Sequence, residues 1–338
     1  MAEPLLRIIY PHAGGRGWDT VTTLVTLASR LLGGEVTRFE GFPSAARKAL
    51  SVAPRRTGGD DILLICPAPY ALSFVLEFPE LLRGHRRVVA WVIDSFWDDR
   101  IPRVARHRGH IDRLFVNDAE VVDSWSQQTG IETSALPFGA DVLRHGTPGG
   151  DRPYDLQIVG RQPATWSAPD ARSAAEAAGL RCAPAAPYLD NDPEGNQQGL
   201  RDSMSLSKFT LAFSNLAAPA AYTHPTRAYI TGRWTEALAV GSVVAGIAPD
   251  CLAADRLFWP GATLELGTVE RTPGLPILRE AARGWTPELA RHNYRMALER
   301  LDWRWRLRAL ADALGRPTPA LDAELRELAN LIAAEGQP

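Results

Sequence analysis

Hydrophobic residues along the first half of the chain follow an alternating strand and helix pattern. Segment 18–34 (WDTVTTLVTLASRLLGG) has helical spacing and ends at a glycine, and 120–130 (EVVDSWSQQTG) predicts a second helix. Runs of Val, Ile and Leu separated by helices are typical of a parallel sheet buried on both faces, so an α/β domain is expected. The predicted strands are 5–10, 35–40, 60–66, 86–94, 111–118 and 132–139.

The pattern restarts after a segment rich in Gly, Pro and charge near 141–155. New helices are predicted at 170–179 and near 232–240, and two helices close the chain at 286–315, with room for a break, and 318–336. We therefore predict two Rossmann-like domains facing a central cleft, 1–145 and 146–315, with 316–338 as a C-terminal helix able to pack back on the first domain. The predicted strands of the second domain are 155–160, 208–214, 242–246 and 262–267.

The amino-acid composition argues against several classes of protein. The formal net charge of −2 argues against a nucleic-acid-binding surface, which is usually basic. Cys66, Cys182 and Cys251 lie far apart without a CxxC pair, so neither a disulfide scaffold nor a zinc site is expected. The apolar part of the N-terminus is too short for a signal peptide, and no apolar run reaches the roughly 18 residues of a membrane span. A cytoplasmic protein is expected.

Polar residues at strand ends are the candidates for chemistry, because ligands of parallel sheets bind beyond the carboxyl ends of the strands. The first such loop, PHAGGRGWDT (11–20), contains Gly14 and Gly15, which allow close approach of the backbone to a ligand. It is not a GxGxxG motif and lacks the acidic residue of dinucleotide sites, so a dinucleotide is not expected. His12 is either a base in the cleft or an ordinary loop residue.

A second candidate lies in WVIDSFWDDR (91–100), where Asp94 ends a buried strand. A carboxylate there is costly unless it is paired or used, so Asp94 is either a cleft residue or a cap of the next segment. Trp97 is able to stack on an acceptor or simply to pack at the base of the loop. Asp118, in FVNDAE, is most simply explained as a helix cap.

The second domain has the richest motifs. IVGRQ (158–162) offers Arg161 as a bidentate phosphate donor, with a surface arginine as the alternative. In THPTRAYITGRWTEALAVG (223–241) a helix begins near Gly232, whose free amides suit a phosphate, while Arg227 and Arg233 add charge. Glu236, one turn in, is placed either to accept hydrogen bonds from ribose hydroxyls or to offset the helix dipole.

These segments resemble a known family. YITGRWTEALAVGSVVAG (229–246) resembles the donor-binding segment of group 1 glycosyltransferases of the GT-B fold (family 4-like), with the closest similarity to the spore-protein-like (CgeB-like) branch. ALPFGAD (135–141) resembles the segment leading into the interdomain linker of that fold, and IVGR (158–161) the start of its second domain.

The resemblance implies a metal-independent glycosyltransferase with a nucleotide-diphosphate sugar as co-substrate and no other cofactor. Glu236 would bind the ribose, Arg161 and Arg233 the diphosphate, and the loop with Gly14 and Gly15 the acceptor and phosphate side. The expected partners are the nucleotide sugar and a small-molecule or glycan acceptor, with no nucleic acid and no transmembrane segment.

Two departures from the family pattern concern the sugar end of the donor site. Ala228 stands where retaining members carry an acid, and the loop after Arg161 has no lysine; Lys208 is the only lysine in the second domain. An inverting route needs a base, for which His12 and Asp94 are the candidates, whereas a retaining route depends on stabilising the leaving group. A nucleotide-sugar 2-epimerase-like enzyme and a non-catalytic nucleotide- or sugar-binding protein remain as alternatives.

Overall fold

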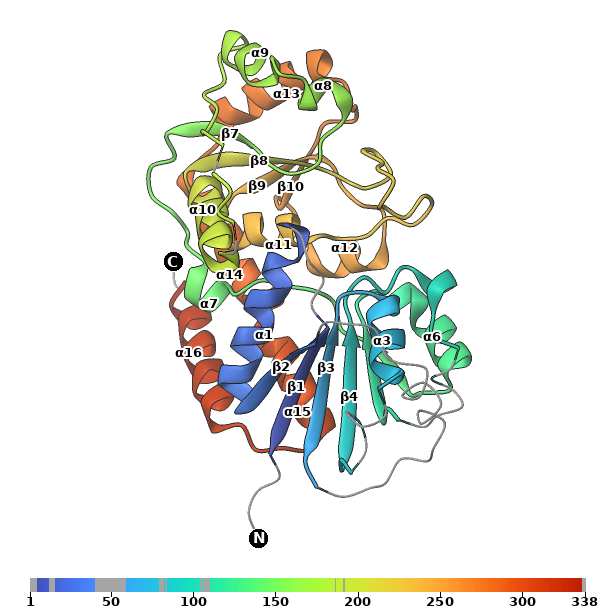
Figure 1. The fold of residues 1–338 in the computed structure, drawn as a ribbon. Coiled ribbons are helices and arrows are strands. Elements are labelled where there is room, and N and C mark those ends of the chain that lie inside the picture. Colours follow the sequence, from blue (N-terminus) through green and yellow to red (C-terminus); the bar gives the residue numbers. More distant parts are fainter. Residues whose placement is uncertain are drawn as a thin grey trace. The chain divides into compact units, whose positions relative to one another are not determined.

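The computed structural model describes residues 5–11, 16–39, 59–78, 82, 84–103, 105, 110–185, 187–190 and 192–335. The chain divides into two compact units, one made of Met1–Pro137 with Arg304–Leu325, the other of Phe138–Trp303 with Arg326–Pro338. Each unit has its own parallel sheet (Figure 1).

The sheet of the first unit has six parallel strands in the order β2-β1-β3-β4-β5-β6. Its central strands β3 and β4 are apolar and buried along nearly their whole length, as expected for strands covered on both faces. The strands are β1 (Leu6–Pro11), β2 (Gly34–Phe39), β3 (Asp61–Cys66), β4 (Arg87–Val92), β5 (Arg113–Val116) and β6 (Thr133–Ala135).

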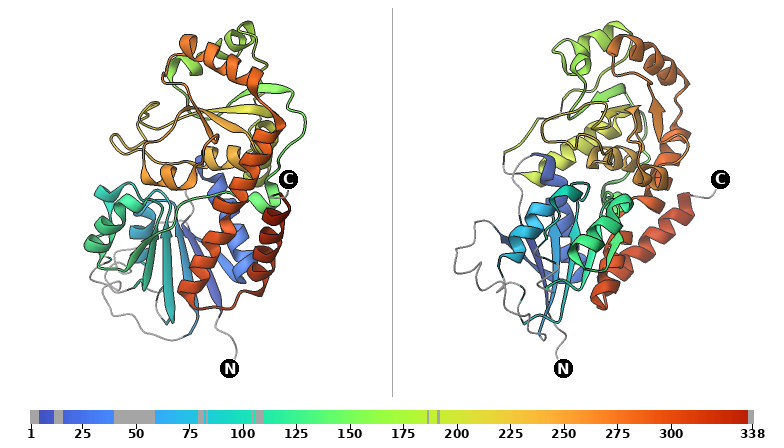
Figure 2. Two further views of the ribbon diagram at one scale, coloured as in Figure 1. Left: turned by 180° about the vertical axis from the view of Figure 1, so that it is seen from behind. Right: turned by 90° about the vertical axis from the view of Figure 1, so that its right-hand side faces the viewer.

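Helices cover both faces of this sheet. Helices α3 (Pro69–Leu76) and α6 (Val122–Thr129) pack on one face in a cluster that includes Ile9 and Trp125. Because side chains alternate along a strand, the neighbours of Ile9 point to the opposite face, where α1 (Asp19–Leu32) contacts β1 and β2. Figure 2 shows α15 (Trp303–Leu314) beside α1. Helix α1 ends as predicted at Gly33, whose positive φ of 66° suits glycine.

The sheet of the second unit has four parallel strands in the order β10-β9-β8-β7. Helices α8, α9 and α13 cover one face through a cluster centred on Phe209 and Leu211, while α10 and α11 contact the other face (Figure 1). The elements are β7 (Tyr154–Ile158), α8 (Ala164–Ser167), α9 (Ala171–Ala177), α10 (Pro193–Ser205), β8 (Ser207–Phe213), α11 (Gly232–Ala239), β9 (Val243–Ile247), α12 (Leu252–Leu257), β10 (Thr263–Glu265), α13 (Arg271–Gly284) and α14 (Pro287–Arg300).

Short elements complete the described chain. They are the 3-10 turns η1 (Arg16–Trp18), η2 (Asp98–Arg100) and η3 (Ala119–Val121), helix α7 (Val142–His145) and the last helix α16 (Pro319–Glu335). No helix in the described part of the chain combines the length and the apolar character that crossing a membrane requires.

The division into units differs from the predicted domain boundaries. The first unit ends at Pro137 rather than 145, because Ala140 exchanges backbone hydrogen bonds with Leu301 and Trp303 of the second unit (2.9 and 3.0 Å). Residues 304–315, predicted in the second domain, belong to the first unit, where Leu307 and Leu310 are fully buried. The predicted long helix 286–315 is broken between α14 and α15 at this crossing.

Candidate functional site

The carboxyl ends of β7 and β8 in the second unit bring several predicted residues together. Arg161 follows β7, and Asn215 follows β8, at the same edge of the parallel sheet. Helix α11 begins here at Gly232, and its N-cap residue Thr231 makes no side-chain capping hydrogen bond. The first-turn amides of α11 therefore lack the acceptor that a capping side chain usually provides.

Arg233 connects α11 to the loop after β7. Its Nη1 donates to the carbonyl oxygens of Val159 (3.2 Å) and Arg161 (2.6 Å). Gly160 lies between these carbonyls with a φ of 67°, and a Cβ there would lie 3.1 Å from Arg233 Nη1. Both the left-handed backbone and the close approach of Arg233 thus favour glycine at this position.

Arg161 and Arg233 form a pair of like charges. Burial, and next the charge of Arg161, lower the pKa of Arg233 to about 10. The Arg161 guanidinium lies 5.7 Å from the centre of the Tyr222 ring, and its Nε is buried without a hydrogen-bond partner. Among the described residues, no carboxylate forms a salt bridge with either arginine. The edge therefore carries positive charge that an anion would balance.

The loop between β8 and α11 is held by residues that the sequence analysis missed. Asn215 Nδ2 donates to the carbonyl oxygens of His224 (2.9 Å) and Arg227 (2.7 Å). His224 Nδ1 accepts from the backbone amides of Thr226 and Arg227 (3.2 and 3.0 Å), so this nitrogen is unprotonated in the arrangement observed. These bonds fix the backbone of Arg227, a predicted phosphate ligand, next to the start of α11.

Glu236 lies inside α11 and is 2% exposed. Its Oε2 is 3.8 Å from Nη1 of Arg201, a buried residue of α10 that the sequence analysis did not select. No local pattern marks Arg201, because its helix is polar and the pairing spans two helices. A buried carboxylate is costly without such a charge, so Arg201 offsets part of the cost of burying Glu236.

Neither of the two departures from the family pattern is compensated by a polar group of Ala228 or by Lys208. Ala228 is buried, with 9% of its surface exposed, and offers no polar group. Lys208 stands near the start of β8, at the opposite edge of the sheet from Arg161, and its Nζ donates to Asp155 Oδ1 (2.7 Å) and the Ala282 carbonyl (3.2 Å). Lys208 therefore does not replace the missing lysine of the loop after Arg161.

In the first unit, Asp94 and Asp118 follow the neighbouring strands β4 and β5. Burial, and next the nearby Asp118 carboxylate, raise the pKa of Asp94 to about 8. Ser95 Oγ donates to Asp118 Oδ2 (2.9 Å), and Trp125 Nε1 donates to the Ser95 carbonyl (2.9 Å). An Asp with this pKa exchanges protons near neutral pH, which suits a general base.

The prediction that Asp118 is a helix cap was wrong. Asp118 occupies the N-cap position of η3 but makes no side-chain capping bond, because its carboxylate is turned to Ser95. The capping alternative for Asp94 has no support either, since the N-cap of η2 is Trp97 and makes no side-chain capping bond.

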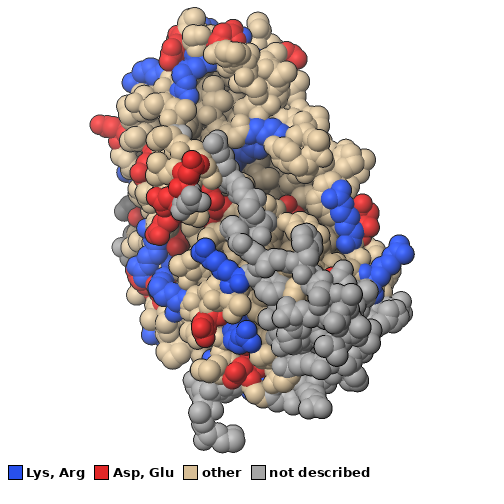
Figure 3. Space-filling view, viewed as in Figure 1, with Lys and Arg blue, Asp and Glu red and all other residues tan. Residues whose placement is uncertain are grey.

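The remaining predicted site residues are Trp97, which the structure describes, and three residues of the first loop, which it does not. The Arg100 guanidinium lies 3.6 Å from the centre of the Trp97 ring and the Phe96 ring centre lies 5.8 Å away, so one face of the indole is already occupied. His12, Gly14 and Gly15 lie outside the described residues. On the face seen in Figure 3, described Lys and Arg residues are interspersed with Asp and Glu.

Comparison with known proteins bears on the fold. The chain matches no family model and no curated protein. Among solved structures, an alpha-glucosyltransferase in complex with UDP-glucose and DNA containing an abasic site matches with a TM-score of 0.51 and 13% identity, over 93% of this chain and 100% of that chain.

The chain has the GT-B fold. This confirms the predicted α/β class with two Rossmann-like units, each built on a parallel sheet. In the GT-B fold found here, four of the predicted donor residues, Arg161, Arg227, Gly232 and Arg233, lie on one edge of the second sheet, and Glu236 lies one turn into the helix that starts there.

Proposed function

We propose that this protein transfers a glycosyl group from a nucleotide-diphosphate sugar to a hydroxyl group of a small-molecule or glycan acceptor. The observation that carries the proposal is the pair of Arg161, which follows β7, and Arg233, at the start of α11, whose charges no described carboxylate balances. A diphosphate supplies negative charge for such a site. The glucosyltransferase to which this chain is structurally similar shares the GT-B fold.

The donor side follows from the chemistry of these residues. The diphosphate would accept hydrogen bonds from the first-turn amides of α11 and from the free donors of Arg161 and Arg233. Glu236, which is paired with Arg201, would accept hydrogen bonds from the ribose hydroxyls. In the transfer step the bond between the anomeric carbon and the phosphate oxygen breaks, and the positive groups stabilise the charge that develops on the diphosphate. We propose that no metal ion is needed for this step.

The acceptor side would use a base. The acceptor oxygen forms the new bond to the anomeric carbon and its proton passes to a carboxylate, for which Asp94 is the best placed of the described candidates by its pKa of about 8. The resemblance of 229–246 to the donor-binding segment of the group 1 and spore-protein-like enzymes supports the donor side of the proposal at the level of the motif.

Nucleotide binding is the first test. Isothermal titration with UDP, GDP, ADP and dTDP should give saturable binding by at least one of them. Arg161→Ala should weaken that binding roughly 10- to 100-fold, as expected for loss of a charge-assisted contact. Arg291→Ala, on the exposed side of α14, should leave it unchanged and serves as the control.

Turnover is the second test. The donor sugar of the nucleotide that binds is incubated with a panel of hydroxyl acceptors, and product masses are measured. A product heavier than the acceptor by one glycosyl unit supports the transferase. Epimerised donor without transfer would replace this proposal by the epimerase, and nucleotide binding without any conversion would leave a binding protein. Absence of binding by every nucleotide would refute the donor site itself.

A further inference from the structure

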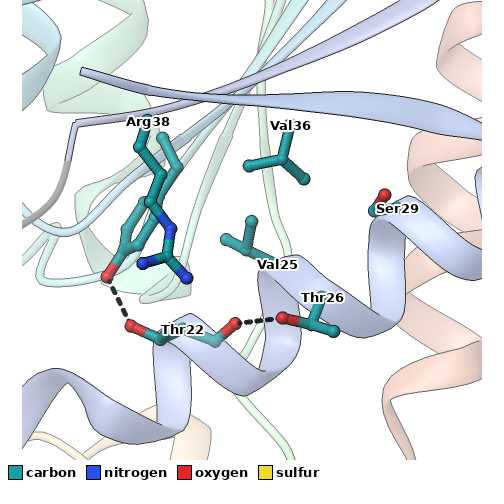
Figure 4. A pocket seen from close by; sticks show the side chains of 7 residues that line it. Thr22, Val25, Thr26, Ser29, Val36 and Arg38 are labelled. Atoms are coloured by element: carbon teal, nitrogen blue, oxygen red, sulfur yellow. Dashed lines mark hydrogen bonds between the residues drawn. The ribbon is translucent and has the colours of Figure 1, made fainter. Parts of the chain in front are cut away.

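A pocket of about 300 Å³ opens in the first unit between helix α1 and the edge strand β2 (Figure 4). Val25 of α1 and Val36 of β2 form its apolar walls. The remaining lining groups are the hydroxyls of Tyr10, Thr22, Thr26 and Ser29 and the guanidinium of Arg38. Nothing in the donor site uses these residues, so the pocket needs an explanation of its own.

The hydroxyl groups that line this pocket already donate their protons in hydrogen bonds within the protein. Thr26 Oγ1 donates to the Thr22 carbonyl (3.2 Å), and Ser29 Oγ donates to the Gly34 carbonyl (2.6 Å). Thr22 Oγ1 donates to a carbonyl one turn earlier (3.4 Å), so the bond between Thr22 and the Tyr10 hydroxyl (3.2 Å) uses the proton of Tyr10. The side chains of Thr26 and Ser29 therefore offer oxygen lone pairs, which accept hydrogen bonds.

Arg38 supplies positively charged hydrogen-bond donors to the same pocket. Its side chain is exposed, and in Figure 4 the guanidinium points into the space near Thr22. Within the described part of the chain no carboxylate pairs with Arg38. The pocket thus combines hydrogen-bond acceptors on the helix with a cationic donor on the strand.

We propose that this pocket binds a small polyhydroxylated acid. Hydroxyl groups of the ligand donate to Thr26 and Ser29, and its carboxylate or phosphate accepts from Arg38. The volume suits a compound of about the size of one sugar. That this ligand is the glycosyl acceptor rests on the proposed function, whereas the binding does not.

The test is titration of the full chain with matched compounds. D-gluconate and glucose 6-phosphate carry hydroxyls and an acid, D-sorbitol carries the hydroxyls alone, and acetate the acid alone. At least one of the two acids should bind saturably, and about tenfold or more tightly than sorbitol and acetate. Binding of gluconate alone identifies a carboxylate ligand, and binding of glucose 6-phosphate alone identifies a phosphate ligand.

Three variants locate the site. Arg38→Met should weaken binding of the acid roughly 10- to 100-fold, and the isosteric Thr26→Val should weaken it several-fold. Arg103→Met, an exposed arginine of the same unit, should change nothing. Circular dichroism of each variant confirms that it is folded.

The proposal is overturned if neither acid binds, or if Arg38→Met and Thr26→Val both leave the affinity unchanged. The nucleotide titration separates this result from failure of the proposed function. Nucleotide binding without acid binding removes only this pocket, and acid binding without nucleotide binding removes only the transferase.

Discussion

Asp94 is a residue whose protonation affects stability as well as chemistry. Its pKa of about 8 in the folded chain lies above the ordinary value of 3.8, because burial and Asp118 disfavour the carboxylate. Folding therefore takes up a proton between these pH values, and the free energy of unfolding falls as the pH rises from about 4 to about 8. Above that range the cost of the buried charge is complete.

Replacing the Asp94 carboxyl group by an amide removes the cost of ionising it in the folded protein at high pH. We expect Asp94→Asn to raise the melting temperature at pH 9 relative to the wild type, with a smaller or reversed difference at pH 4, where Asp94 is protonated. Thermal unfolding between pH 4 and 9 measures this. Asp123→Asn, on the exposed side of α6, is the control. A pH-independent difference between Asp94→Asn and the wild type would contradict the assignment.

The buried ion pair of Arg201 and Glu236 should contribute more to the free energy of unfolding than the exposed pair of Arg291 and Glu288, although the exposed pair is shorter. Arg201→Met removes the buried cation that lies 3.8 Å from the Glu236 carboxylate and should lower the free energy of unfolding by about 3–5 kcal/mol. The matched control Arg291→Met breaks an exposed pair with Glu288 at 2.6 Å and should cost less than about 1 kcal/mol.

Urea unfolding of both variants checks this prediction. Adding Glu236→Gln to Arg201→Met should recover part of the loss, because the buried charge is then neutral. Equal losses for Arg201→Met and Arg291→Met would show that burial does not decide the strength of these pairs.

Single residues were predictable from sequence only where their place in the chain fixed their place in the sheet. Arg161 and Asp94 follow strands that the sequence predicted, so their positions at the carboxyl ends were evident. Arg201 and Asn215 act through partners on other elements, and no local pattern marks them. Asp118 was misassigned because the pattern could not show that Ser95 lies within hydrogen-bond distance.

At the scale of elements, the loop after β7 and the start of α11 bring together the guanidinium groups of Arg161 and Arg233, which repel each other in the absence of a ligand. Arg161→Ala removes this repulsion from Arg233 and keeps the carbonyl of residue 161 that Arg233 uses. We expect the ligand-free variant to be as stable as the wild type or more stable, while the increase in melting temperature caused by the binding nucleotide is lost.

Differential scanning fluorimetry with and without that nucleotide measures both effects. Arg233→Ala is the comparison, since it also removes two hydrogen bonds to the loop after β7 and should lower the stability of the ligand-free protein. A fall in ligand-free stability for Arg161→Ala that equals that of Arg233→Ala would mean that Arg161 has a structural role.

The strands were predicted more completely than the helices. The apolar runs that form both sheets were evident, because strands buried on both faces need continuous hydrophobic residues. Helix α13 was not predicted, since it contains Pro276 and Gly274, which are unfavourable inside helices. Helix α10 was missed for a similar reason, because it has two glycines and few apolar residues. Packing against a sheet outweighs local preference in both.

At the scale of the whole molecule, the chain returns from the second unit to the first through Arg304–Leu325. Within this segment Glu324 pairs with the fully buried Arg304 (2.7 Å), and Glu324 also pairs with Arg30 of α1 (2.7 Å), which holds the segment to the rest of the first unit. The partners Arg30 and Glu324 are 294 residues apart, so sequence periodicity contains no sign of the contact. The sequence therefore could not show where the chain returns to the first unit.

Glu324→Gln should loosen the returning segment without affecting the second sheet. The substitution removes the carboxylate from the buried Arg304 and should cost about 3 kcal/mol or more. Hydrogen exchange should become faster in 304–325 and in α1, whereas strands β7 to β9 keep their protection, because they belong to the other unit. Glu327→Gln is the control, three residues later on α16, where Glu327 makes an exposed pair with Arg144 of the second unit (2.8 Å). Uniform acceleration across both units in Glu324→Gln would show that the two sheets unfold as one cooperative body, and that the returning segment has no separate stability.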